Sequence, residues 1–113
     1  MTNARPAGFN ELLHFPVRLS LVSLLAPAAY TEFSYLREAT GLSDSALSKQ
    51  LTTLQDAGYV EVRRTGRRAT ARLTDTGRHA LNQHAHALRA LLGNALDPTH
   101  TGEPTPANTG EPG

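Results

Sequence analysis

The 113-residue chain contains no cysteine, and its 11 lysine and arginine residues nearly balance its 10 acidic residues. This length suits one domain, and the lack of cysteine excludes a disulfide framework and a thiolate metal site. The first 15 residues lack the apolar run typical of a secretory signal, and the most apolar stretch, residues 19–29, is too short to span a bilayer. We therefore expect a soluble protein of the cytoplasm.

The charges are distributed unevenly along the chain. From Asp97 onward there are three acidic residues and no basic one, so the preceding part holds all 11 basic residues against seven acidic ones. Six of these basic residues fall between Tyr59 and Arg78, where only Glu61 and Asp75 oppose them. Such a local concentration of positive charge predicts a surface that binds an anion.

Composition divides the chain into three parts. Residues 1–8 are expected to be a flexible N-terminus, and residues 9–96 the folded domain. Residues 97–113 are rich in Pro, Gly and Thr and contain TGEP twice, so they cannot bury enough apolar surface to fold, and we expect a disordered tail.

In chain order, the apolar residues of 9–15 predict a short helix. Pro16 suits the first position of a second helix, which Pro27 ends. Residues 30–33 are too few for more than an edge strand. A short helix follows over 34–40, and Gly41 suits its left-handed C-terminal residue.

A further helix is predicted from Ser43 to about Ala57. Ser43 is a favourable N-cap, and Asp44 lies in the first turn, where the helix dipole favours a negative charge. Leucines at positions 47, 51 and 54 form a narrow apolar seam. The face opposite this seam is polar and comprises Ser45, Ser48, Lys49, Thr52 and Asp56.

Residues 59–73 predict a β-hairpin, because apolar and polar residues alternate on both sides of the stretch RRTGRR. With Thr65 and Gly66 as a two-residue turn, Arg63 would lie opposite Arg68. Arg64 would likewise lie opposite Arg67. Like charges directly opposite each other destabilise a hairpin. Local folding therefore does not explain the four arginines, whereas an external polyanion would.

The last predicted helix is capped by Thr74 and runs to about Leu92. Its leucines and alanines lie near heptad spacing, so the helix could pack against a copy of itself. The residues expected in this interface, with two from the N-terminal segment, are Leu12, Leu13, Leu81, Ala85, Leu88, Leu91 and Leu92.

The order of elements predicts a mainly α protein with a small β-hairpin wing (α+β), in which a helix-turn-helix is followed by a wing. The stretch LSDSALSKQLTTLQDAGYVEVRRTGRRATARLT resembles the recognition helix and wing of the ArsR- and MarR-type winged-helix regulators of bacteria. HFPVRLSLVSLLA resembles their first core helix and LTDTGRHAL the start of their closing helix, so the resemblance covers about Leu13 to Leu92.

This resemblance implies a homodimeric transcriptional regulator, with repression as the expected direction, that binds a pseudo-palindromic operator in double-stranded DNA. The helix residues that would lie at the DNA are Ser43, Asp44, Ser45, Ser48, Lys49, Gln50, Thr52 and Thr53. The wing residues that would lie on the phosphate backbone are Arg63, Arg64, Thr65, Gly66, Arg67 and Arg68.

Ligand sensing does not follow from the resemblance, because the chain lacks the long extra helices and the cysteines that sensing members use. The histidines at 79, 84 and 86 do not converge on one face closely enough to hold a metal ion, so we expect them to be solvated or at an interface, and His14 to be structural. No metal or cofactor is predicted. A small-molecule or protein effector is left open.

Catalysis is not expected, because the chain contains no Walker loop, no GxGxxG, no GxSxG and no HExxH motif. The alternative to a DNA-binding regulator is a winged helix used for protein–protein assembly. Salt-sensitive binding to a nonspecific duplex would distinguish the two.

Overall fold

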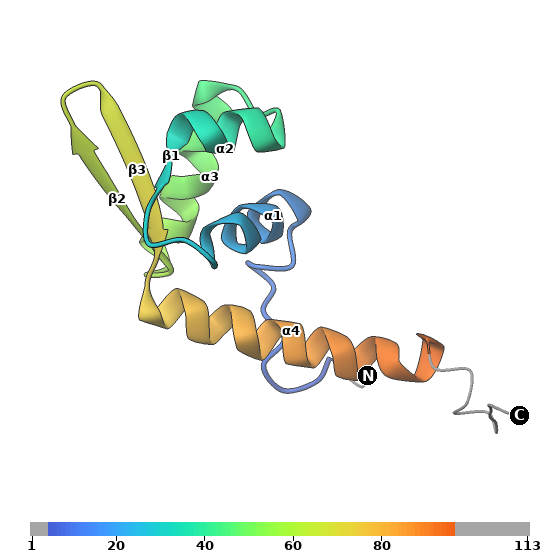
Figure 1. Cartoon of the computed structure of the whole chain (residues 1–113). Helices are drawn as coiled ribbons and strands as arrows, with labels where there is room; N and C mark the ends of the chain where they lie inside the picture. The colour runs from blue at the N-terminus through green and yellow to red at the C-terminus, as the bar shows by residue number, and fades with distance from the viewer. Residues whose placement is uncertain (1–4, 97–113) are drawn as a thin grey trace, which may run out of the picture.

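The computed structural model describes residues 5–96, which form four helices and a three-stranded antiparallel sheet (Figure 1). The predicted tail over 97–113 and the first four residues lie outside the described residues. The elements in chain order are α1 (Pro16–Leu25), β1 (Thr31–Glu32), α2 (Phe33–Thr40), α3 (Asp44–Asp56), β2 (Val60–Thr65), β3 (Arg68–Leu73) and α4 (Asp75–Leu96).

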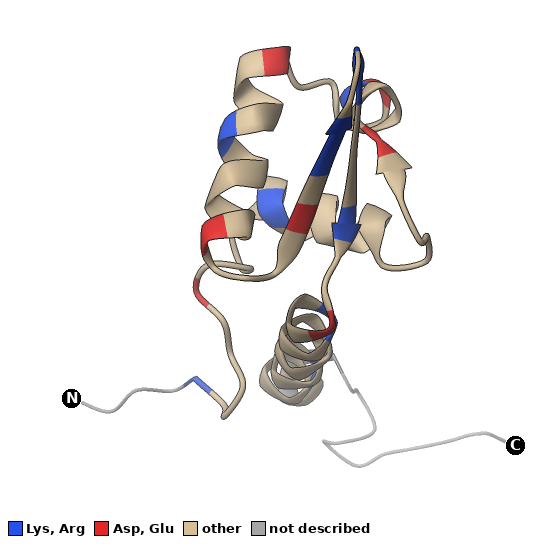
Figure 2. Ribbon diagram, turned by 90° about the vertical axis from the view of Figure 1, so that its left-hand side faces the viewer, with Lys and Arg blue, Asp and Glu red and all other residues tan. Residues whose placement is uncertain are grey.

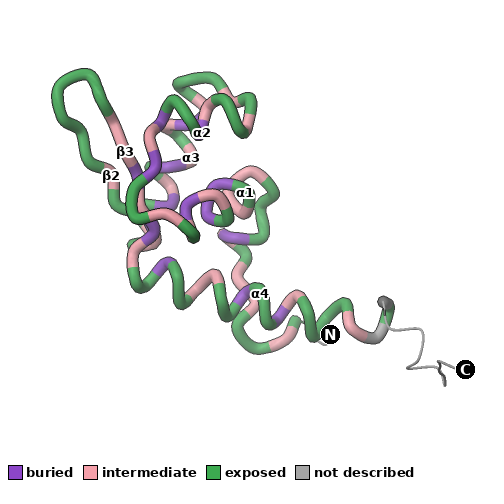
Figure 3. Tube along the Cα trace, viewed as in Figure 1, coloured by how far each residue is buried: buried purple, intermediate pink, exposed green. Residues whose placement is uncertain are grey.

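Most of the buried positions lie where α1, α2, α3 and the sheet meet (Figure 3). Most of these core residues are leucines. Each fully buried leucine contributes about 1.5–3 kcal/mol relative to an exposed one. The leucines without solvent exposure are Leu13, Leu21, Leu25, Leu36, Leu47 and Leu54. The three helices therefore pack around one apolar centre, which leaves the outer face of α3 in solvent.

The predicted N-terminal helix over 9–15 is wrong, because this segment forms only turns. The Asn10 side chain accepts a hydrogen bond from the Leu13 N–H at 3.0 Å and closes a single turn. Phe15 has extended backbone angles, as the ring of a following proline favours. Pro16 thus begins α1, as predicted, and excludes a helix that continues into it.

The predicted helices around the helix-turn-helix are confirmed to within a residue or two. Gly41 has φ of 75° and ends α2 in the left-handed conformation. The Ser43 hydroxyl accepts the Ala46 N–H at 3.2 Å and caps α3. These contacts are local in the chain, which is why the sequence predicts them well.

The hairpin is confirmed, but its predicted register is wrong. Val60 pairs with Leu73 and Thr65 with Arg68, so the two-residue turn is Gly66-Arg67 rather than Thr65-Gly66. Gly66 has φ of 60°, which the first central position of a primed hairpin turn requires. In this register Val60 and Leu73, each 3% exposed, close the core together.

The change of register removes the like-charge pairs. Arg63 faces Thr70 and Arg64 faces Ala69 across the strands, so neither arginine lies directly opposite another. The predicted edge strand is confirmed as β1, which pairs with β3 and gives the sheet order β1-β3-β2.

Helix α4 crosses beneath the other elements, at the end of the molecule opposite the hairpin tip (Figure 1). Thr74 precedes it, and the Thr74 hydroxyl accepts the Gly77 N–H at 2.9 Å and donates to the Gly58 carbonyl at 2.6 Å. The helix continues to Leu96, one turn beyond the predicted end. Its C-terminal end extends past the other helices and the sheet (Figures 1 and 3).

Candidate nucleic-acid interface

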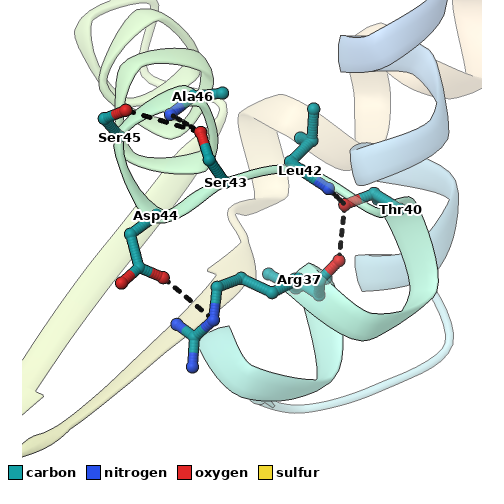
Figure 4. Close-up of polar contacts among 8 residues, drawn as sticks. Arg37, Thr40, Leu42, Ser43, Asp44, Ser45 and Ala46 are labelled. Atoms are coloured by element: carbon teal, nitrogen blue, oxygen red, sulfur yellow. Dashed lines mark hydrogen bonds and ion pairs between the residues drawn. The ribbon is translucent and has the colours of Figure 1, made fainter.

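The N-terminus of α3 is held by a set of short-range contacts that set its position beside α2 (Figure 4). Thr40 donates to the Leu36 carbonyl at 2.6 Å and accepts the Leu42 N–H at 3.2 Å. Asp44 in the first turn of α3 pairs with Arg37 of α2 at 3.0 Å. The turn between the two helices is therefore fixed at both ends.

The leucine seam of α3 faces the core, so the opposite side of this helix faces solvent. Ser45, Lys49 and Thr52 are exposed on that side, as predicted. Ser48 is half-buried and lines a cleft beside the wing. These four side chains place hydroxyl and ammonium groups along one accessible face of the helix.

Gln50 and Thr53 are less well placed to contact DNA. Gln50 is half-buried, and its side-chain oxygen accepts a hydrogen bond from Arg18 of α1 at 3.0 Å. The half-buried Thr53 donates its hydroxyl back to the Lys49 carbonyl at 3.2 Å. Both stay predictions as contact residues, but their polar atoms are already engaged within the protein.

The four arginines of the wing are exposed and have different surroundings. The Arg63 guanidinium lies 4.7 Å from the centre of the Tyr30 ring, and that of Arg64 lies 5.3 Å from the Phe33 ring. Arg68 forms an ion pair with Glu32 of β1. Arg67 occupies the turn itself.

A cleft of about 300 Å³ lies between the wing, the start of α2 and the start of α3. Four arginines line it against two carboxylates, so the cleft is positive. Its charged residues are Glu32, Arg37, Asp44, Arg64, Arg67 and Arg68. Figure 2 shows a run of basic positions along the hairpin and another on the outer side of α3, among basic positions on other elements. A guanidinium cluster beside a polar helix face can hold phosphate groups while the helix contacts bases.

The chain matches the winged helix DNA-binding domain family over residues 17–92. It belongs to that family. It is also 33% identical over 88 residues to MJ0432, an uncharacterized protein of Methanocaldococcus jannaschii, a match that covers 74% of this chain and 96% of that one.

Two solved structures are similar to this winged helix domain. A transcriptional regulator homologue from Pyrococcus horikoshii has a TM-score of 0.73 at 22% identity, over 77% of this chain and 90% of that one. The transcriptional repressor BigR from Xylella fastidiosa has a TM-score of 0.61 at 32% identity, over 75% and 83% of the two chains. The chain is thus a DNA-binding regulator of transcription, and such regulators are generally not enzymes.

The predicted dimer residues of the winged helix domain fall into three groups by their exposure. Leu13 is fully buried in the core, so its assignment to a dimer interface is wrong. Leu91 and Leu92 are 41% and 45% exposed near the end of α4. The others are half-buried or exposed on the same helix or in the N-terminal segment, and these are Leu12, Leu81, Ala85 and Leu88.

His84 is buried without solvent exposure, against the prediction of a solvated or interface residue. Its Nδ1 accepts the Asn10 N–H at 3.0 Å, and its ring packs edge-on against Phe9 at 4.9 Å. Burial lowers the pKa of His84, and the nearby His14 lowers it further. The ring therefore ties the N-terminal segment to α4, a packing role that its helical spacing alone does not reveal.

Within residues 5–96, no three side chains of the kinds that bind metals gather into one site. In the same part of the chain, no helix combines the length and apolar character needed to cross a membrane.

The sequence alone did not predict four neighbours of the wing and of α3, namely Tyr30, Glu32, Phe33 and Arg37. The pairing of β1 with β3 brings three of them there, and strand pairing between such distant segments leaves no local pattern. The one available signal is the expected edge strand over 30–33, whose partner the sequence did not identify.

Proposed function

We propose that this winged helix protein is a homodimeric, sequence-specific regulator that places α3 in the major groove and the wing on the phosphate backbone. The positive cleft between the hairpin and the start of α3 carries this proposal, because it adjoins the exposed face of Ser45, Lys49 and Thr52. Phosphate contacts would set the register of the protein on the duplex, and the helix face would discriminate bases.

Two features of α4 support the homodimer. The 22-residue helix is about 33 Å long at 1.5 Å per residue, and it carries the exposed Leu91 and Leu92 in its last two turns. Pairing of two such helices about a two-fold axis would bury these leucines and present two copies of α3. Half-sites about one helical turn apart in the operator would match that arrangement.

Repression is the proposed direction of regulation, because BigR, to which this chain is similar over most of both lengths, is described as a transcriptional repressor. The cytoplasm is the proposed location, where such a regulator meets DNA. An effector is not assigned.

The proposal is tested with an operator obtained by selecting genomic fragments that the protein binds. Affinity is then measured by fluorescence anisotropy on the operator and on a random duplex, over a series of salt concentrations. Arg67→Ala should weaken both duplexes by similar factors and reduce the slope of log affinity against log salt by about 0.9. Lys49→Ala should cost about 1–3 kcal/mol on the operator and less on the random duplex if it contacts a base.

Arg89→Ala is the matched control, because it removes the same charge from an exposed position on α4. It should leave both affinities and the salt slope nearly unchanged. If the natural protein binds no duplex in a salt-dependent manner, or if Arg67→Ala behaves like Arg89→Ala, the wing serves another partner. The alternative of a protein–protein assembly module would then be favoured.

A further inference from the structure

Three of the four arginines in the wing are engaged by the short segment Tyr30–Phe33. Tyr30 lies under Arg63, Phe33 lies under Arg64, and Glu32 between them forms an ion pair with Arg68. Cation–π contacts of this kind hold a guanidinium against the ring while leaving its edge accessible. The segment therefore fixes the hairpin from its side, close to the tip.

Strand pairing explains why Glu32 reaches Arg68. Glu32 pairs with Thr70 of β3, so its side chain lies on the same face of the sheet as Thr70 and as Arg68, two residues before it. Diagonal neighbours of this kind lie within reach of long side chains. The carboxylate thus stands beside the wing because of the sheet, and any change in the pairing would remove it.

Arg67 differs from its three neighbours. Among the residues that the structure describes, it is the one wing arginine for which neither an ion pair nor an aromatic ring contact is seen. The free protein accordingly presents one unengaged guanidinium at the turn, whereas the guanidinium of Arg68 is neutralised.

We propose that Glu32 is a positioning residue that competes with DNA phosphate for Arg68 and so limits the affinity of the wing for any duplex. This inference rests on the proposed contact between wing and backbone. The Arg68 and Glu32 side chains are 70% and 45% exposed, and ion pairs in such positions contribute little to stability. A phosphate group can therefore replace the carboxylate, since guanidinium binds both with the same paired hydrogen bonds.

Asp44 forms an ion pair with Arg37 in the same cleft and would likewise compete with phosphate for that arginine. It also lies in the first turn of α3, where its charge favours the helix. Replacing Asp44 would change the helix and the cleft together. Glu32 is therefore the residue through which the competition can be measured separately.

The test is Glu32→Gln, measured by anisotropy on the operator and on a random duplex from about 0.1 M to 1 M salt. Release of Arg68 adds up to one phosphate contact, so the slope of log affinity against log salt should steepen by up to about 0.9. Over this tenfold range of salt, the affinity of the variant should therefore fall by up to roughly eightfold more than that of the natural protein. Both duplexes should tighten by similar factors, because phosphate contacts carry no sequence information.

Glu61→Gln is the matched control, because Glu61 forms a comparable ion pair with Arg72 at 2.8 Å in the same sheet. Arg72 does not line the cleft, so this variant changes the net charge equally without freeing a guanidinium there. Its effect on the salt slope should be clearly smaller than that of Glu32→Gln.

A double-variant cycle decides whether Glu32 acts through Arg68. In an Arg68→Ala background, Glu32→Gln should no longer steepen the salt slope. A steepening that persists there, or one that Glu61→Gln reproduces, would overturn the inference in favour of simple repulsion between the carboxylate and DNA. If Arg67→Ala weakens binding but Glu32→Gln has no effect, the competition by Glu32 is rejected and the wing contact stands. If Arg67→Ala also has no effect, the proposed contact between the wing and DNA phosphate is rejected.

Discussion

Gly77 lies in the first turn of α4, against the Tyr59 backbone that follows the helix-turn-helix. A Cβ atom built on Gly77 would lie 2.1 Å from the Tyr59 carbonyl oxygen and 2.9 Å from Cδ1 of Leu73. The first of these neighbours is backbone, so it cannot move aside as a flexible side chain could. Gly77→Ala should therefore displace the start of α4.

The expected cost follows from what that displacement breaks. Overpacking of a fitted contact costs about 1–3 kcal/mol. The Thr74 N–H donates to the same Tyr59 carbonyl at 2.9 Å, and the Thr74 hydroxyl donates to the Gly58 carbonyl, so two hydrogen bonds are strained as well. The higher helix propensity of alanine returns at most about 1 kcal/mol. We expect a net loss of about 2 kcal/mol, or roughly 8–16 °C in melting temperature for a domain of this size.

Thermal unfolding followed by circular dichroism measures this loss, with all variants at one protein concentration so that any dimerisation affects them equally. Gly93→Ala is the control, because it is the same substitution in the same helix with no atom within 4 Å of the added Cβ. It should leave the melting temperature unchanged or raise it. A Gly77→Ala variant that melts at or above the temperature of the natural protein would refute the close approach of α4 to Tyr59.

Two further predictions concern α4. Because burial lowers the pKa of His84 below its ordinary value of 6.5, the free energy of unfolding should be fully maintained above about pH 6.5 and should fall as the pH drops toward the lower pKa of the folded protein. Urea unfolding at several pH values should show that the free energy of unfolding falls less with decreasing pH in His84→Gln than in the exposed control His79→Gln. Equal falls in the two variants would contradict His84 as the source of this pH dependence. Leu92→Glu should halve the mass measured by light scattering at micromolar concentration while the helical circular dichroism is kept, because a charge would be buried at the proposed dimer interface. Asn82→Glu adds the same charge at an exposed position of the same helix and should leave the mass unchanged, whereas a natural protein that is already monomeric would exclude the interface.

The sequence by itself determined the features that depend on neighbours in the chain. Pro16 begins α1, Gly41 ends α2 and the Ser43 side chain caps α3, each through contacts within four residues. The leucine period of α3 determined which face turns outward, and so the exposed positions of Ser45 and Lys49. Caps, special backbone angles and helical periodicity act over one or two turns, which is why a single sequence reveals them.

Only the tertiary structure decided the features that depend on residues far apart in the chain. The hairpin register followed from closing the core with Val60 and Leu73 together, rather than from the turn residues. Leu13 became buried because the N-terminal segment packs on the core, and His84 because the same segment contacts α4. Glu32 met Arg68 because β1 pairs with β3. Each of these contacts forms only when the packing of the whole domain outweighs the entropy of closing a long loop, and no local pattern records which distant partner is chosen.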